Sequence, residues 1–160
     1  MTKACNWIRE DLHTLTPRIV YKNAEKAIEF YEKAFGAKRR MVSKSPQGNI
    51  MHAEIQVGNS VLFMVDEVPH MGCMSHESIG QAGFSLYLAV EDVDSSFKKA
   101  VDAGCTVKMP VADMFWGDRY GVVVDPFGNS WELATHKEDL SQSEIEERAK
   151  AAFCDMAKAK

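Results

Sequence analysis

The sequence contains no apolar run that approaches the roughly 20 residues needed to cross a bilayer, so a membrane-spanning helix is not expected. No apolar stretch follows the lysine near the N-terminus, which argues against a secretory signal and predicts a cytoplasmic protein. Basic charge is not in excess either, because 19 Lys and Arg face 23 Asp and Glu and no basic stripe stands out. We therefore expect neither a nucleic acid nor a membrane as a partner.

Cysteine is scarce, and its positions share no metal-binding or disulfide spacing. Cys5, Cys73, Cys105 and Cys154 are spread along the chain without a C-x-x-C pair. This pattern is typical of reduced thiols and not of a disulfide framework or a zinc knuckle. A Gly-rich phosphate or dinucleotide loop is missing, as is a recognisable Ser-His-Asp or Cys-His signature. The sequence therefore gives no support to a nucleotide- or dinucleotide-binding enzyme, or to a hydrolase with a Ser or Cys nucleophile.

The composition is that of an ordinary soluble domain, with 46% hydrophobic and 26% charged residues among 160. An internal repeat organises the chain, because three landmarks recur at nearly one offset. Asn23 and Asp92 lie 69 positions apart, Gly36 and Gly104 lie 68 apart, and Gly58 and Gly128 lie 70 apart. The repeat predicts two similar modules.

Each module is predicted to have the element order β-α-β-β-β, which makes the fold class α+β. Asn23 and Asp92 are expected to cap the two helices, because their side chains accept a hydrogen bond from an unpaired N–H at the helix start. Gly36 and Gly104 are expected to end these helices. The predicted strands cover 15–21, 39–43, 49–57 and 60–65 in the first module and 83–90, 106–109, 117–124 and 130–135 in the second.

The modules are assigned to residues 13–66 and 83–139, within a single domain over 1–139. The linker 67–82 has little periodicity and is a candidate flap over a pocket. An amphipathic helix is predicted in the extension 140–160, because Ser141 and Glu144 form a capping box and apolar residues follow at helical spacing. This helix could pack on its own domain or dock on a partner subunit, and both alternatives stay open.

Two stretches of the sequence resemble a known superfamily. One is the helix entry from Asn23 to Tyr31, and the other runs from Trp116 to Asp139, with YGVVVDPFGNSWEL at 120–133 inside it. Together with the paired modules, they resemble the vicinal oxygen chelate superfamily, which contains glyoxalase I, bleomycin-resistance proteins, fosfomycin-resistance enzymes and extradiol dioxygenases. Within it, the chain looks like the PhnB-like, glyoxalase-related branch. The likeness covers about residues 13 to 139.

The resemblance implies two curled sheets around a cleft, closed within one chain or completed by a swapped homodimer. It also implies a divalent metal that polarises vicinal oxygens of the substrate, held by up to four residues on the first and last strands of the modules. Counting from the helix caps and the hairpin glycines places Thr16, Ser85, Leu62 and Glu132 there, where the family commonly has His, Gln or Glu. Because only Glu132 keeps a ligating side chain, we expect the inherited metal site to be largely lost. We therefore assign no cofactor to the protein, and the alternative is that it binds a divalent metal.

His52 and Glu54 are candidates for a rebuilt site. They alternate onto one face of the predicted strand 49–57, and with Glu132 they could hold Zn²⁺, Fe²⁺ or Mn²⁺. The alternative interpretation is that both residues lie on the solvent-facing side of a half-buried strand.

Glu132 is the candidate catalytic residue. A partly buried carboxylate has a raised pKa and suits a general base, whereas the alternative is an ion pair with Arg119 or Arg18. Arg119 could in turn clamp an anionic ligand, or pair with Asp118 or Asp125.

The leading prediction is a glyoxalase- or bleomycin-resistance-like protein that binds a small molecule in the cleft between the modules. The residues expected to line this cleft are Thr16, His52, Glu54, Leu62, Ser85, Trp116, Arg119, Tyr120 and Glu132. One alternative is a metal-dependent lyase, transferase or dioxygenase that uses His52, Glu54 and Glu132. The other is an antibiotic-sequestering homodimer whose Phe115, Trp116 and Trp131 trap a flat molecule by stacking.

Overall fold

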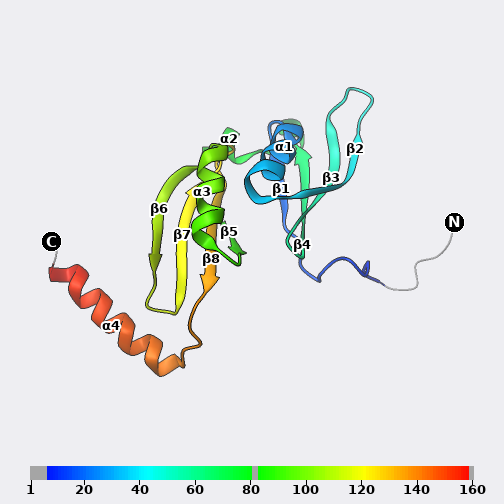
Figure 1. Ribbon diagram of the computed structural model, residues 1–160. Coiled ribbons are helices and arrows are strands. Elements are labelled where there is room, and N and C mark those ends of the chain that lie inside the picture. Colours follow the sequence, from blue (N-terminus) through cyan, green and yellow to red (C-terminus); the bar gives the residue numbers. More distant parts are fainter. Residues whose placement is uncertain (1–6, 81–82, 159–160) are drawn as a thin grey trace. The chain divides into compact units, whose positions relative to one another are not determined.

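The computed structural model describes residues 7–80 and 83–158, with side chains as far as residue 152. The chain divides into two compact units, residues 1–81 (unit 1) and 82–160 (unit 2), each of which holds one four-stranded mixed sheet (Figure 1). The predicted α+β class with two β-α-β-β-β modules is therefore confirmed. In the described ranges we find no helix with the length and apolar character that crossing a bilayer requires.

Unit 1 begins with β1 (Arg18–Tyr21) and α1 (Ala24–Phe35), followed by β2 (Lys38–Lys44), β3 (Ile50–Val57) and β4 (Ser60–Asp66). The strand order is β1-β4-β3-β2, and only the β1–β4 pair is parallel. The side chain of Asn23 caps α1 by accepting a hydrogen bond from the Lys26 N–H at 3.0 Å. Gly36 ends the helix in the left-handed conformation, with φ of 65°. Both expected boundaries of this helix are thus observed.

One face of the unit 1 sheet packs under α1. Tyr21 on β1 and Tyr31 on α1 are fully buried, and their hydroxyls lie 3.0 Å apart. Strand register places Leu62 and Ile55 on this same face, because Tyr21 pairs with Asp66 on β4, Leu62 lies four residues before Asp66 on that strand, and Leu62 pairs with Ile55. The opposite face, which α1 does not cover, presents Met41, His52, Glu54 and Phe63 and is called here the open face of unit 1.

The segment after β4 is short but ordered. It contains a 3₁₀ turn η1 (Pro69–Met71) and a one-turn helix α2 (His76–Ile79), which packs on β1. Glu67 accepts hydrogen bonds from the hydroxyls of Ser75 and Ser78 at 2.7 and 2.8 Å. The predicted flap therefore has internal hydrogen bonds, and the Glu67 N–H, which donates to the Tyr21 carbonyl at 2.8 Å, ties it to β1.

Unit 2 repeats the plan with β5 (Ser85–Ala89), α3 (Val93–Ala103), β6 (Thr106–Asp113), β7 (Asp118–Val124) and β8 (Ser130–His136). The order β5-β8-β7-β6 matches that of unit 1, again with one parallel pair, β5–β8. The Asp92 side chain accepts a hydrogen bond from the Ser95 N–H at 3.2 Å and so caps α3 as predicted.

The helix α3 covers one face of the unit 2 sheet so closely that β7 needs a glycine there. A Cβ added to Gly121 would lie 2.8 Å from the ring of Phe97 on α3. Leu133 pairs with Gly121 and is fully buried on this face. The opposite face presents Ser85, Tyr87, Tyr120, Val122 and Glu132, and is called here the open face of unit 2.

The predicted capping box of the C-terminal helix α4 (Gln142–Lys158) is present. The Glu144 N–H donates to the Ser141 hydroxyl at 3.4 Å, while the Ser141 N–H donates to the Glu144 carboxylate at 2.8 Å. Among the described elements, α4 packs against no other helix or strand.

The thiols of Cys73 and Cys105 are free, as expected. Burial, with a smaller contribution from Asp125, raises the pKa of Cys105 to about 12. Cys5 and the side chain of Cys154 lie outside the described residues.

Candidate functional site

Glu132 lies in a hollow on the open face of unit 2. Its cross-strand neighbours are Tyr87 on β5 and Val122 on β7. The hydroxyls of Ser85 and Tyr120 donate to its carboxylate. The hollow has a volume of about 630 Å³, and its wall includes Phe84, Ser85, Lys108, Met109, Tyr120 and Glu132. Three of the predicted site residues, Ser85, Tyr120 and Glu132, are therefore brought together.

Strand geometry explains why these three side chains meet. Ser85 and Tyr87 are two residues apart on β5 and so point to the same face. Tyr120 and Val122 do the same on β7, beside Glu132 on β8. Burial and the hydrogen bond to Glu132 raise the pKa of Tyr120 to about 12. Tyr120 is therefore a hydrogen-bond donor to the carboxylate throughout the neutral pH range.

Asp118 is the centre of a second cluster on the same sheet face. It accepts hydrogen bonds from the Tyr87 hydroxyl at 2.9 Å and the Trp116 indole N–H at 3.0 Å, and its Oδ1 lies 2.8 Å from His136 Nδ1. Burial opposes ionisation, but these hydrogen bonds lower the pKa of Asp118 below its ordinary value. The paired carboxylates of Asp118 and Asp139 raise the pKa of His136.

Aromatic rings connect the two clusters. Tyr87 and Tyr120 are stacked with ring centroids 6.4 Å apart, and Trp116 meets Tyr120 edge-on at 5.5 Å. Sequence reasoning found Trp116 and Tyr120 but missed Tyr87, Asp118 and His136. The signal was available for Tyr87, because it shares a strand face with the predicted Ser85.

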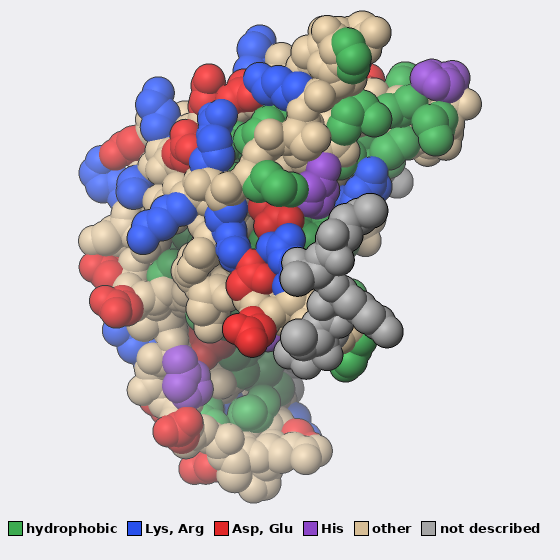
Figure 2. Space-filling view, turned by 90° about the vertical axis from the view of Figure 1, so that its right-hand side faces the viewer, with side chains coloured by type: hydrophobic (Ala, Val, Ile, Leu, Met, Phe, Trp, Pro, Cys, Tyr) green, Lys and Arg blue, Asp and Glu red, His purple; other side chains and the backbone are tan. Residues whose placement is uncertain are grey.

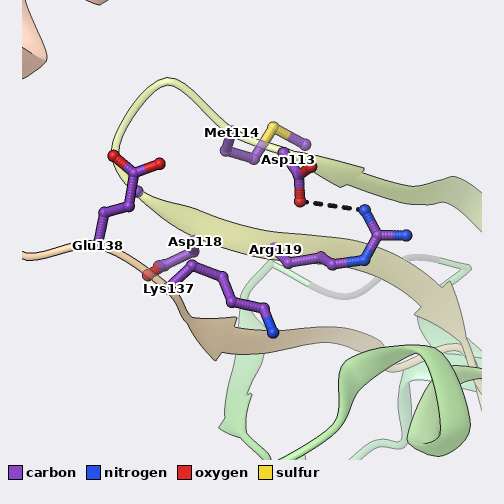
Figure 3. A pocket seen from close by; sticks show the side chains of 7 residues that line it. Asp113, Met114, Asp118, Arg119, Lys137 and Glu138 are labelled. Atoms are coloured by element: carbon purple, nitrogen blue, oxygen red, sulfur yellow. Dashed lines mark hydrogen bonds and ion pairs between the residues drawn. The ribbon is translucent and has the colours of Figure 1, made fainter.

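Arg119 points to the other face of β7. Its guanidinium donates to both carboxylate oxygens of Asp94 on α3, at 2.6 and 2.8 Å, and to Asp113 at 3.0 Å. The structure therefore pairs it with Asp94 and Asp113, and not with the partners considered from sequence. Arg119 on β7 and Lys137, which directly follows β8, border a hollow of about 420 Å³, in which their side chains extend in the same direction (Figure 3).

Glu54 and His52 are adjacent on the open face of unit 1, as the alternation predicted. Glu54 is only 2% exposed, and Arg9 from the N-terminal segment donates to both of its oxygens at 2.7 and 2.8 Å. His52 Nε2 lies 3.1 Å from the same carboxylate. The Arg9 hydrogen bonds outweigh burial and lower the pKa of Glu54 to about 2. Sequence patterns gave no signal for Arg9, because it precedes the periodic elements.

Leu62 does not share the position of Glu132. It pairs with Ile55 beneath α1 and is 5% exposed. The reason is that Gly58 is the first residue of a two-residue turn between paired Val57 and Ser60, whereas Gly128 is the fourth residue of a five-residue turn between paired Val124 and Ser130. Counting four residues from each glycine therefore leads to opposite sheet faces.

Phe63 is the residue of unit 1 that matches Glu132 in register. Phe63 pairs with Arg18, five residues before the cap of α1, and Glu132 pairs with Tyr87, five residues before the cap of α3. Thr16 precedes β1, and its hydroxyl donates to the His13 carbonyl at 3.4 Å.

Within either unit, the described residues contain no group of three or more His, Cys, Asp and Glu side chains that could hold a metal ion. In unit 2, Glu132 has hydroxyls as its hydrogen-bonding neighbours, and hydroxyls are poor ligands for a transition metal.

Comparison with known proteins identifies the family. The Glyoxalase/Bleomycin resistance protein/Dioxygenase superfamily profile matches residues 12–133. The chain belongs to this superfamily. The predicted resemblance is thus confirmed, and the hollow around Glu132 lies within the superfamily region of the chain.

Relatives of this superfamily protein occur in distant organisms. An uncharacterized protein from Mycobacterium tuberculosis is 38% identical over 135 residues, which cover 82% of this chain and 79% of the relative. The X-ray structure of an Arabidopsis thaliana gene product has a TM-score of 0.62 and 25% identity, covering 77% of this chain and 98% of the plant protein. The PhnB protein of Bacillus cereus has a TM-score of 0.61 and 21% identity, with 77% and 99% covered. The last match confirms the likeness of the fold to PhnB-like proteins.

Proposed function

We propose that this superfamily member binds a small organic molecule in the hollow around Glu132, on the open face of unit 2. The observation that carries the proposal is the carboxylate of Glu132, oriented by the hydroxyls of Ser85 and Tyr120 inside a hollow of about 630 Å³. Such a volume falls within the range of small-molecule sites, which combine apolar walls with a few oriented polar groups. Binding, and not metal-assisted catalysis, is the function favoured here.

The chemistry of the wall indicates what the ligand presents. Glu132 accepts hydrogen bonds from ligand N–H or O–H groups, and Lys108 offers a positive charge on the same wall. Phe84 is 43% exposed, which leaves an aromatic surface for a ring or an alkyl chain. A molecule with an apolar body and a donor group directed at Glu132 fits these features.

Loss of the inherited metal site is part of the proposal. Thr16 and Ser85 are hydroxyl residues, Leu62 is buried under α1, and Phe63 stands at the matching register. Three ligands of N, O or S type are the usual requirement of a catalytic transition metal. A metal-dependent enzyme that uses His52, Glu54 and Glu132 would also need Arg9 to release Glu54.

The test compares ligand binding by the wild-type protein and by Glu132→Gln. A panel of aromatic alcohols, amines and carboxylates is screened by ligand-observed NMR on the full chain. We expect hits that bind wild type and lose at least tenfold in affinity in Glu132→Gln, a loss that corresponds to ~1.4 kcal/mol. Asp102→Asn is the matched control, because it removes an exposed carboxylate on α3. Hits that bind both variants equally would contradict the proposal.

A second candidate function is sequestration of a flat antibiotic, favoured by the contact of Trp116 with Tyr120, which is itself stacked on Tyr87. Ring stacking predicts quenching of Trp fluorescence by a planar aromatic drug. Quenching that persists in Trp116→Phe would show that the drug lies elsewhere.

We also propose that the protein is a homodimer. The apolar spacing of α4 supports a role for this helix in the partner contact, because α4 packs against no other described element. Light scattering on the full chain and on a variant that ends at Asp139 tests this idea. If both proteins are dimers, α4 is not needed for the partner contact. If the full chain is a monomer, the homodimer proposal is wrong.

A further inference from the structure

Arg9 covers a carboxylate in the middle of the unit 1 sheet. Glu54 stands opposite Met41 on β2 and Phe63 on β4, so both neighbouring strands place an apolar side chain beside it. Its side chain is 3% exposed, although α1 lies on the other face of the sheet. The two guanidinium N–H groups of Arg9 meet its two oxygens in a parallel fork. The carboxylate is thus buried and paired with a group from outside the sheet.

The segment that carries Arg9 is held to unit 1 mainly by charge. Asp11 accepts hydrogen bonds from Arg9 at 2.8 and 3.1 Å and also pairs with Arg40 on β2. Apolar anchoring is limited, because Trp7 is 84% exposed, Leu15 is 86% exposed, and Ile8 and Leu12 are only half-buried. Segments with few buried apolar contacts open at low free energy. Arg9 can therefore leave Glu54 without disruption of the sheet.

Once Arg9 has left, the Glu54 carboxylate favours one kind of ligand group. Two carboxylate oxygens in a fork select a planar guanidinium over an ammonium group, which offers a point charge without the matching pair of N–H bonds. His52 and Phe63 lie beside the carboxylate, with ring centroids 4.8 Å apart in an edge-on arrangement. These rings provide an aromatic surface for the body of a ligand.

Charged groups of both signs lie next to Glu54, because Arg9 pairs with both Glu54 and Asp11. Figure 2 shows basic and acidic side chains next to one another on the viewed face. Arg40 on β2 is already paired with Asp11. The guanidinium that satisfies Glu54 is thus supplied only by Arg9 among the residues that the structure describes.

We propose that Glu54, with His52 and Phe63 beside it, is a binding site for a small molecule that carries a guanidinium group, and that Arg9 is a built-in competitor for this site. The site lies within unit 1 and does not rest on the function proposed for Glu132. A ligand binds only the fraction of molecules in which Arg9 has left Glu54. If this fraction is about one in ten, the apparent Kd is about tenfold weaker than the intrinsic one.

Benzylguanidine is the probe, and its binding to the full chain is measured by calorimetry. We expect Arg9→Ala to bind it about tenfold more tightly than wild type. Benzylurea has a similar shape without the charge, and benzylamine has the charge without the fork, so both should bind at least tenfold more weakly to Arg9→Ala. Arg39→Ala is the matched control, because it removes an arginine of β2 that pairs with Glu25 on α1, and it should behave as wild type.

Removal of the Glu54 carboxylate distinguishes binding at the proposed site from binding at other anionic surfaces of the protein. The double variant Arg9→Ala/Glu54→Gln should lose the gain in benzylguanidine affinity. Equal binding of benzylguanidine and benzylurea to Arg9→Ala, or unchanged affinity in the double variant, would overturn the proposal.

A second measurement uses wild type and does not depend on the folding of a variant. An endoprotease that cleaves before aspartate cuts the Glu10–Asp11 bond faster when Arg9 has left the site. Benzylguanidine should accelerate this cleavage at least threefold, and benzylurea should not. No acceleration at any benzylguanidine concentration that binds wild type would overturn the role of Arg9. A capped Gly-Arg-Gly peptide that competes more tightly than benzylguanidine would assign the site to a protein arginine instead.

Discussion

The stability of unit 1 should depend on the Arg9–Glu54 pair in a way that changes with pH. The pKa of Glu54 falls from 4.5 to about 2, and the hydrogen bonds from Arg9 are the largest cause. Each tenfold change in an acid constant corresponds to ~1.36 kcal/mol, so the difference sets an upper limit of ~3 kcal/mol. Arg9 is 49% exposed, and water screens an exposed ion pair. We therefore expect Arg9→Ala to lower the free energy of unfolding by ~1–2 kcal/mol at pH 7.

The sign of the pH dependence follows from the direction of the shift. A carboxylate whose folded pKa is lowered stabilises the fold above its unfolded pKa and loses this effect as pH falls through the folded value. The stabilisation by Glu54 is thus complete above about pH 5 and is lost between pH 4.5 and about 2. At pH 3 less than half of it remains, so the difference between wild type and Arg9→Ala should shrink by more than half.

Urea unfolding at pH 7, 4 and 3, followed by circular dichroism, measures this difference. Glu54→Gln and the double variant complete a double-mutant cycle, in which the coupling energy between residues 9 and 54 should be ~1–2 kcal/mol at pH 7. A difference between wild type and Arg9→Ala that stays constant from pH 7 to pH 3 would refute the reasoning, because it would show that Arg9 acts through packing and not through the Glu54 charge.

Three further predictions concern unit 2 and the thiols. Gly121→Ala should lower the free energy of unfolding by about 2 kcal/mol, because its Cβ would lie 2.8 Å from the Phe97 ring, and an unchanged urea midpoint would contradict the close packing of α3. Asp125→Ala should lower the free energy of unfolding by roughly 3 kcal/mol, since this buried carboxylate accepts two backbone N–H bonds and an indole N–H bond in the turn before β8. Calorimetry measures this loss, and Asp92→Ala, which removes an exposed helix cap, should cause a smaller one. Iodoacetamide at pH 8 should modify Cys73 at least tenfold faster than Cys105, whose pKa burial raises to about 12, and equal rates by peptide mass mapping would show that Cys105 is accessible.

The sequence predicted the fold well because its signals are local. Asn23 and Asp92 cap the two helices, and Gly36 ends α1, as helix capping chemistry requires. Several strand boundaries coincide with the expected ones, and the others differ by one to four residues, since tertiary pairing decides where a ladder ends. The β1 strand, for example, begins at Arg18 and not at residue 15.

The candidate site was harder to predict because it depends on register and on contacts far along the chain. Ser85 and Glu132 were placed by counting from the Asp92 cap and from Gly128, and the structure brings both of them, with Tyr120, to one hollow. Leu62 was placed by counting from a glycine, and the count fails when two hairpin turns differ in length. Arg9 reaches Glu54 across 45 positions, and no periodic pattern announces such a contact.

The unequal hairpins also matter for protein engineering. A designer who wished to give unit 1 an acid equivalent to Glu132 would replace Phe63, because its strand neighbours correspond to those of Glu132. The same acid at Leu62 would be placed in the core beneath α1 and would unfold the unit. The difference in length between the two hairpin turns thus decides whether an acid four residues after the glycine stands on the open face or in the core of its unit.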